Sequence, residues 1–473
     1  MRKFYVYCLL ALLSACTQHH QTTEIRFAIA QAPLNLDPRY ATDAASERVN
    51  RLLYQRLVEF DASSKVIPGL ADWQALSPQR YRLTLKQNTA PFHHGKALNA
   101  DDVKATYDSL LALKDSPHVA EYRNIAAIQV IDSRTLMFEL KAADTHFPEK
   151  LIIGILPNDL IVKGYDFSHA PIGNGRLKFV RWQGALVLQH VNSGKKVILT
   201  EVKDPTVRVL KLLHGEADLL QGDLPPELVK YLQSKPEIHV NTGQGANFSY
   251  LGLNMQDPVL KQLKVRQALA YAIDRQAIID KVMVENTHIA GAILPPEHYA
   301  GNATLQPYTY QPALAKQLLQ EAGFQLPLKL VYKTSTDAQR VRFATILQAQ
   351  MAPAGIDLEI RSLDWGTFFE DVKQGKFQLF GLTWVGIKTP EIYAKAFGSA
   401  YVPPNGFNRG RYIDAELDAL LQNEDWQAAT QRIHAQLPYI PLWYEGQFVA
   451  YRTHIKGYMP AVDGNWDSLA DVN

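Results

Sequence analysis

The sequence predicts an α/β protein of two large lobes or about three domains. The chain has 473 residues, and one domain takes roughly 150. Apolar residues make up 47% of the chain and charged residues 20%, which is typical of globular proteins and not of disordered ones. Strand patterns alternate with helix patterns along most of the chain, as an α/β architecture requires.

The charge balance argues against nucleic acid as a partner. The chain has 49 basic and 47 acidic residues, a formal net charge of +2, and no run of five or more lysines and arginines. A surface that binds phosphates along a nucleic acid is normally strongly basic.

The N-terminus has the pattern of a secreted lipoprotein. A basic start is followed by an apolar run over residues 4–13, which is too short to span a bilayer, and then by Leu13-Ser-Ala-Cys16. This tetrapeptide resembles the bacterial lipobox, in which the cysteine is lipidated and becomes the mature N-terminus. We therefore expect a signal peptide over 1–15, lipid on Cys16, and a polar tether over 16–23. A buried strand is the alternative for the apolar run.

Between residues 24 and 164 the hydrophobic spacing predicts three strands and two helices. The first strand, 24–30, alternates apolar and polar residues. One helix opens at Ser46, and a second follows Asn99, where Asp102 three places on completes a capping pattern. The other two strands are expected at 81–85 and 135–140.

The next segment, to about residue 246, reads as short strands and turns. Strands are expected at 177–180 and 186–190. A short helix lies between Asp204, which caps it, and Gly215, which ends it.

From about residue 247 a longer α/β stretch follows. We expect helices over 264–282, 312–322 and 336–354, and strands over 328–332, 356–363 and 377–384.

Several segments carry motifs that are more specific than periodicity. Residues 90–103 hold an aromatic-His-x-Gly turn that leads into an Ala-Asp-Asp-Val helix start, and residues 264–275 read Lys-Val-Arg-Gln-Ala-Leu-Ala-Tyr-Ala-Ile-Asp-Arg. Shorter matches lie at 34–38, 210–218 and 440–444. Together these segments resemble the family 5 extracellular solute-binding proteins, the receptors for peptide, nickel and related ABC importers.

The resemblance implies a two-lobed, type II-like periplasmic-binding-protein fold (a Venus flytrap) with an extra small α/β domain. Lobe I would combine a base of residues 24–45, 165–246 and 447–473 with a small domain, 46–164, and lobe II would hold 247–446. The chain would cross between the lobes near 245–249 and 445–447. Gly245 and Gly446 could absorb a dihedral change there and act as the hinge.

The resemblance also implies a ligand held between the lobes. Each candidate residue of the site also has an ordinary structural explanation. The aromatic residues could belong to the core, Asn254 could fix a strand end, and the cationic residues could be solvated. The candidates are Tyr40, Tyr250, Asn254, Trp384, Gly386, Lys388, Phe407, Asn408 and Arg409.

One departure from the family pattern concerns the ligand. Peptide-binding members carry an aspartate a few residues after the tryptophan at 384, and it pairs with the α-ammonium of the peptide. No acid stands between Trp384 and Pro390 here, and Lys388 has the opposite charge. We therefore expect N-blocked or cyclic peptides, cell-wall fragments or a non-peptide solute, unless Asp364 or Glu391 reaches the site.

The resulting prediction is a lipid-anchored, extracytoplasmic substrate-binding component of an ABC importer. It is expected to be a monomer at the periplasmic or extracellular face of the cell envelope, with a permease and ATPase as partners. We expect no cofactor and no metal, since the paired residues 93–94 and 101–102 lack spaced ligands. Catalytic motifs such as Gly-x-Ser-x-Gly and His-Glu-x-x-His are absent from the sequence, so an enzyme is not expected. A lipid-anchored hydrolase, or a chaperone or signalling lipoprotein on the same fold, are the alternatives.

Overall fold

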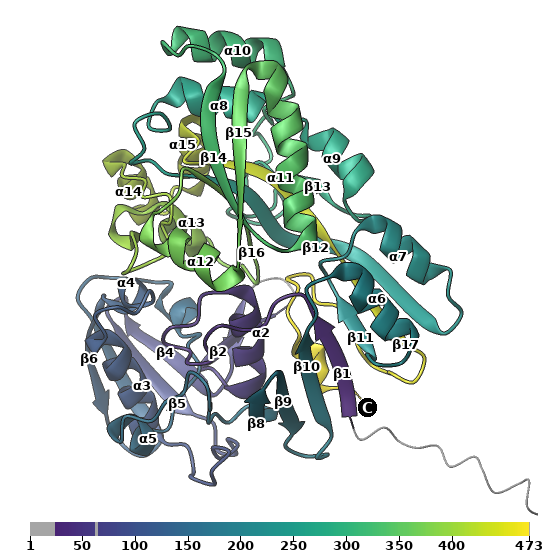
Figure 1. The fold of residues 1–473 in the computed structure, drawn as a ribbon. Coiled ribbons are helices and arrows are strands. Elements are labelled where there is room, and N and C mark those ends of the chain that lie inside the picture. Colours follow the sequence, from purple (N-terminus) through teal and green to yellow (C-terminus); the bar gives the residue numbers. More distant parts are fainter. Residues whose placement is uncertain (1–23, 62–64, 473) are drawn as a thin grey trace, which may run out of the picture.

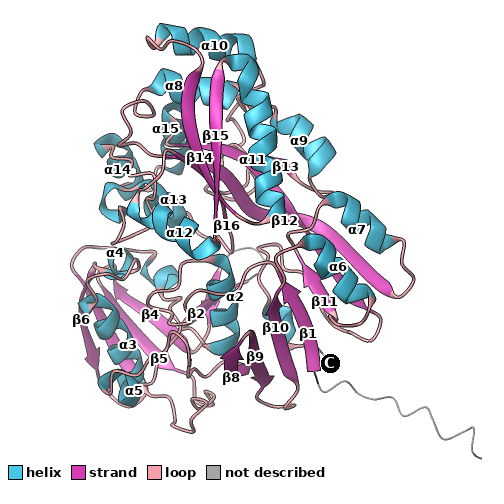
Figure 2. Cartoon of the chain, viewed as in Figure 1, coloured by secondary structure: helices cyan, strands magenta, loops and turns pink. Residues whose placement is uncertain are grey.

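The computed structural model describes residues 24–61 and 65–472, which form two lobes (Figure 1). An 11-stranded sheet runs through both lobes in the order β15-β14-β16-β12-β17-β11-β1-β10-β9-β8, and β13 pairs with β17. Figure 2 shows these strands in magenta, with helices on both sides. The expectation of a two-lobed α/β fold is confirmed.

The base of lobe I is built around β1 (Glu24–Ile29), which pairs in parallel with β10 and β11. Its core includes Phe27, Val449 and Trp466. The other elements of the base are β8 (Leu177–Gln183), β9 (Ala185–His190), β10 (Lys196–Glu201), β11 (Leu219–Gln221), α2 (Ala44–Leu53), α6 (Pro205–Leu213) and α7 (Pro226–Gln233).

The small domain has a four-stranded antiparallel sheet in the order β4-β5-β7-β6. Its core runs from Leu57 to Ile155, whereas α2 packs in the base core; these limits lie inside the expected range of 46–164. Its elements are β2 (Val58–Phe60), β3 (Val66–Pro68), β4 (Ala71–Ser77), β5 (Arg80–Leu85), β6 (Ile125–Val130), β7 (Thr135–Leu140), α3 (Ala100–Ala112) and α4 (Val119–Tyr122), and α5 (Asn158–Val162) packs on α3.

The expected cap of α3 is confirmed, and it accounts for the acidic pair at its start. The Asn99 side chain accepts hydrogen bonds from the backbone N–H groups of Asp101 and Asp102, and Asp102 accepts one from the Asn99 N–H at 3.0 Å. Asp102 is fully buried and also accepts from Lys96 at 2.5 Å. Each of these contacts is structural.

Lobe II covers the remainder of the large sheet with helices. Its strands are β13 (His288–Ile289), β14 (Leu328–Ser335), β15 (Ile356–Leu363) and β16 (Leu379–Trp384). Its helices are α8 (Leu263–Tyr271), α9 (Arg275–Val282), α10 (Pro312–Glu321), α11 (Ala338–Met351), α12 (Trp365–Gln374), α13 (Glu391–Phe397), α14 (Ala415–Gln422) and α15 (Trp426–Gln436).

The prediction of a single helix over 264–282 is wrong, because α8 ends at Tyr271 and α9 begins at Arg275. Asp274 caps the new helix by accepting from the Ala277 N–H at 3.0 Å. The buried Arg275 guanidinium donates to the Pro441 carbonyl at 2.9 Å, which fixes the start of α9 against β17. Both helices place apolar residues in one core, so their combined pattern resembles one helix.

Two long antiparallel strands connect the lobes. β12 (Ile238–Leu253) and β17 (Tyr439–Arg452) pair along both, with a register shift between Gly243 and Asn247. The chains approach closely here: a Cβ on Gly245 would lie 2.0 Å from the Glu445 carbonyl oxygen, and one on Gly446 would lie 2.1 Å from that of Glu285. Both glycines are therefore required sterically at the crossing.

Candidate ligand-binding site

A cavity of about 270 Å³ lies between the lobes. Lobe I contributes the end of β1, helix α2 and part of the small domain. Lobe II contributes the end of β16 with the loop after it, the start of α11, and residues 407 and 409. The volume is near the lower end of those found for small-molecule sites.

One wall is aromatic and carries a guanidinium. The Arg409 Cζ lies 4.7 Å from the centre of the Trp384 ring and 5.2 Å from that of Phe369. Phe407 meets Trp384 edge-on at 6.0 Å and contacts His118 of the small domain at 5.4 Å. Five of the nine predicted wall residues line the cavity: Trp384, Gly386, Lys388, Phe407 and Arg409.

The other four predicted residues do not line this cavity. Tyr250 and Asn408 lie behind the aromatic wall, where the Asn408 amide donates to the carbonyl of Tyr412 at 2.7 Å. Asn254 donates to the Phe377 carbonyl at 2.8 Å and so fixes a strand end. Tyr40 contacts Asp115 at 3.3 Å.

Lys388 is paired within the protein. Its ammonium lies 3.1 Å from the carboxylate of Asp463, in the C-terminal segment of lobe I. Burial alone would raise the pKa of Asp463, but Lys388 and the Asn465 N–H lower it below its ordinary value. The positive charge after Trp384 is thus neutralised. Ile387 lines the cavity where the family aspartate is expected.

Several buried polar atoms that line the cavity have no hydrogen-bond partner within residues 24–61 and 65–472. They come from the segment after β1, α2, the crossing strand β12, the start of lobe II helices and the C-terminal segment of lobe I. They are Gln31 Oε1, Arg48 Nε, Asn50 Oδ1 and Nδ2, Asn247 Oδ1, Asp337 Oδ2, Trp365 Nε1 and Trp466 Nε1. Buried polar atoms are normally satisfied, so this concentration indicates a polar solute site.

Charged side chains of both signs also face the cavity without an ion pair. Among the described residues, no opposite charge lies within 4.0 Å of the guanidiniums of Arg48, Arg56, Arg340 and Arg409 or of the carboxylates of Glu47, Asp223, Asp337 and Glu445. Burial lowers the pKa of Arg48 and raises that of Glu47.

No sequence motif marks the α2 and α11 residues in this set as part of a site. Arg48 and Asn50 lie on a helix whose apolar spacing predicts only packing against the base. Asp337 has the pattern of an ordinary helix cap, and its backbone contact with Arg340 at 3.0 Å fulfils that role. Their second role depends on the approach of the other lobe, which no local pattern encodes.

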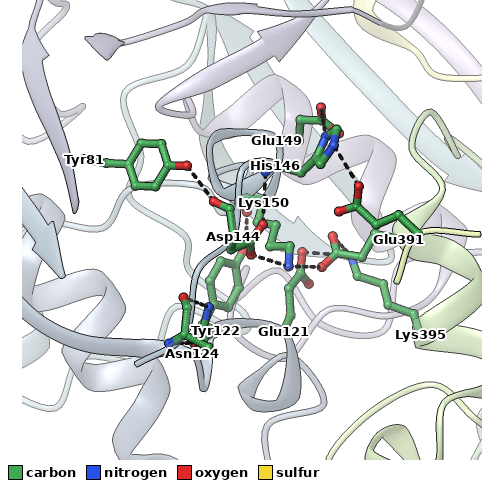
Figure 3. A network of polar contacts seen from close by, with 12 residues as sticks. Tyr81, Glu121, Tyr122, Asn124, Asp144, His146, Glu149, Lys150, Glu391 and Lys395 are labelled. Atoms are coloured by element: carbon green, nitrogen blue, oxygen red, sulfur yellow. Dashed lines mark hydrogen bonds and ion pairs between the residues drawn. The ribbon is translucent and has the colours of Figure 1, made fainter. Parts of the chain in front are cut away.

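Ion pairs join the small domain to lobe II beside the cavity (Figure 3). Glu121 lies 2.8 Å from Lys395, Lys150 lies 3.4 Å from Glu391, and His146 lies 3.2 Å from Glu424. We call these three pairs the latch. Burial alone would raise the pKa of Glu121, but Lys395 and His118 hold it at about 2. The latch therefore stabilises the contact between the small domain and lobe II, and its Glu121–Lys395 pair is largely shielded from solvent.

The residues that the structure describes show neither a candidate metal centre nor a candidate membrane span. No group of three or more histidines, cysteines, aspartates or glutamates is placed to hold a metal ion. No helix among them is both long and apolar enough to cross a membrane.

The fold and the cavity define a class: a two-lobed binding protein that encloses a small solute. Residues 65–400 match the model of the bacterial extracellular solute-binding proteins, family 5 (middle region), and the chain belongs to this family. The resemblance seen in the sequence is confirmed. Members are non-enzymatic, extracellular or periplasmic binding components of transporters, which also confirms that the chain is not an enzyme.

Similar proteins differ in the ligands that they are named for. Di/tripeptide-binding protein 1 of Pseudomonas aeruginosa is 27% identical over 465 residues, covering 87% of this chain and 85% of that protein. Heme-binding protein A of Haemophilus influenzae is 25% identical over 510 residues, covering 94% and 91%. The oligopeptide-binding protein AppA of Bacillus subtilis, solved with a nonapeptide, has a TM-score of 0.87 at 22% identity, covering 95% of this chain and 98% of that one.

Proposed function

We propose that this chain is the lipid-anchored, extracytoplasmic substrate-binding component of an ABC importer, and that it captures a peptide-like or other small solute between its lobes. The observation that carries the proposal is the inter-lobe cavity, where several buried polar atoms have no hydrogen-bond partner among residues 24–61 and 65–472. A solute that satisfies them contacts both lobes and so favours the closed state.

The relatives support a peptide-like solute as the ligand class, since several that are similar over nearly nine tenths of this chain or more are named for dipeptides or tripeptides. Heme-binding protein A shows that full-length similarity at this level does not fix the ligand. The aromatic wall at Trp384 and the guanidinium of Arg409 suit a planar or carbonyl-rich group.

Native mass spectrometry of protein purified under mild conditions tests the proposal. We expect a bound solute of a few hundred daltons that is released by denaturation and binds again after refolding. Arg409→Leu should weaken rebinding, because it removes the only guanidinium of the aromatic wall. Exposed Arg361→Leu, outside the cavity, is the control. Protein that neither carries a solute nor binds any from a periplasmic extract would contradict the proposal.

The lipid anchor rests on Cys16, which lies outside the described residues. Several acyl chains, each CH₂ contributing roughly 0.8 kcal/mol, hold a protein at a bilayer far more firmly than one chain does. We expect Cys16→Ser to yield soluble protein or an uncleaved precursor, measured by membrane fractionation and intact mass. Wild-type protein that is soluble and carries no lipid would disprove the anchor.

A further inference from the structure

Three of the unpaired carboxylates that line the cavity come from three separate segments. Asp223 follows β11 in lobe I, Asp337 caps α11 in lobe II, and Glu445 lies in β17 where the chain crosses between lobes. None of them forms an ion pair with another described residue. The cavity therefore contains carboxylates even though the loop after Trp384 has none before Glu391.

The Asp337 carboxylate is buried, and only one of its two oxygens has a hydrogen-bond partner among the described residues. The side chain is only 5% exposed. Its Oδ1 accepts from the Arg340 N–H at 3.0 Å, and its buried Oδ2 has no partner among the described residues although the residue lines the cavity. An unpaired carboxylate oxygen so far from solvent is costly unless a donor reaches it.

Glu445 is held in place by two hydroxyl groups. Its Oε1 accepts from Ser249 and from Thr383, the latter at 3.0 Å, and these two hydroxyls contact each other at 2.7 Å. No described residue donates to Oε2. The side chain is thus oriented by its neighbours, with one oxygen left for a ligand.

The three carboxylates line one cavity, and the charge of Asp223 affects the ionisation of each of the other two. Burial raises the pKa of Asp337, and the charge of Asp223 raises it further. Burial likewise raises the pKa of Glu445, and Asp223 again adds to the effect. Arg340 acts in the opposite direction on both, and Arg48 is also near Asp223 and Glu445, yet neither guanidinium comes within 4.0 Å of these carboxylates.

We propose that Asp337 and Glu445, together with the more exposed Asp223, bind a primary ammonium group of the ligand. An ammonium offers three N–H donors, and the carboxylates supply acceptors from both lobes and from the crossing strand. The proposal rests on the proposed function and gives its solute a chemical feature. On this proposal, the absence of an acid after Trp384 no longer excludes ligands with a free amine. The acids that would bind the amine are not the two considered from the sequence: Asp364 pairs with Lys203 outside the cavity, and Glu391 belongs to the latch.

A matched pair of probes tests this site: a mixture of lysine-containing di- to pentapeptides with free amines, and the same mixture acetylated at every amine. We expect the free form to bind at least 100-fold more tightly, because breaking a buried ion pair typically costs two to four decades of affinity. A third mixture, acetylated only at the N-terminus, distinguishes the α-amine from the lysine side chain.

The variant Asp337→Asn keeps the helix cap and removes the charge. We expect it, and Glu445→Gln, to abolish the preference for free amines by calorimetric titration. Asp425→Asn is the control, since Asp425 caps α15 through the same kind of contact and lies outside the cavity. Equal binding of free and acetylated probes, no binding of either, or an unchanged preference in Asp337→Asn would overturn the proposal.

Failure of the ammonium site and failure of the proposed function give different results. The solute released from the denatured protein is titrated back into wild-type and Asp337→Asn protein. Rebinding that the substitution does not weaken leaves the binding function in place and overturns the ammonium site. Loss of at least 100-fold in rebinding supports both.

Discussion

At the scale of single residues, the buried ionisable groups divide into those that hold the protein together and those that face the cavity. Glu121 and Lys395 form an ion pair, whereas neither Asp337 nor Arg48 forms an ion pair with a described residue, and each has a buried polar atom without a hydrogen-bond partner there. The sequence identified Trp384 and Arg409 through the family resemblance. It could not identify Asp337 or Arg48, because each has an ordinary local role and becomes part of the site only when distant segments meet.

The Glu121–Lys395 pair predicts acid sensitivity. The pKa of Glu121 is held at about 2, below its ordinary value of 4.5, so its stabilisation is present above pH 4.5 and is lost as the pH falls toward 2. Glu391, whose pKa is raised by burial and by Glu121, acts in the opposite sense. We expect Glu121→Gln to flatten the decline in thermal midpoint between pH 4.5 and 2.

The same substitution should cost about 3 kcal/mol of unfolding free energy at pH 7, near the low end for breaking a buried pair, because Glu391 still lies 3.7 Å from Lys395. Asp108→Asn, which breaks the exposed pair with Lys104, should cost less than about 1 kcal/mol. If urea unfolding gives equal losses of unfolding free energy for the two variants, the buried pair stabilises the protein no more than the exposed pair does.

At the scale of elements, caps and turn residues were the most predictable features. Asn99 and Asp204 cap α3 and α6, as the sequence predicts. The strands at 135–140 and 356–363 have the predicted bounds. The break between α8 and α9 was not predictable, since it depends on a contact between Arg275 and the distant Pro441. The local sequence pattern predicts the bounds of an element when these depend on its own residues. It fails when a contact with a distant residue decides where the element begins or ends.

The acidic start of α3 should be structural, even though it lies in the family signature. Asn99→Ala removes the side-chain half of the capping box and should lower the unfolding free energy by about 1 kcal/mol, while Asn99→Asp should be nearly neutral. Urea titration measures both. A loss of ligand affinity in Asn99→Ala, with stability unchanged, would mean that this segment contacts the solute after all.

At the scale of the whole molecule, the two lobes share one sheet and are joined at β12 and β17. We propose that Gly245 and Gly446, which lie where these strands cross, belong to the hinge. A solute that contacts both lobes should then close them. At about 100 times its dissociation constant the solute should add roughly 2.7 kcal/mol of stability and reduce the radius of gyration in X-ray scattering. Stabilisation without compaction would argue against closure around this hinge.

The crossing strands and the latch join the two lobes at different places. In Figure 1 β12 and β17 run between the lobes at the right, while α4 and α13, which carry the paired Glu121 and Lys395, lie to their left. With the hinge proposed at the crossing, this pair lies on the side of the molecule away from the pivot. Opening of the lobes about that hinge would separate α4 from α13 and break the pair, so the latch would contribute to the energy needed for opening.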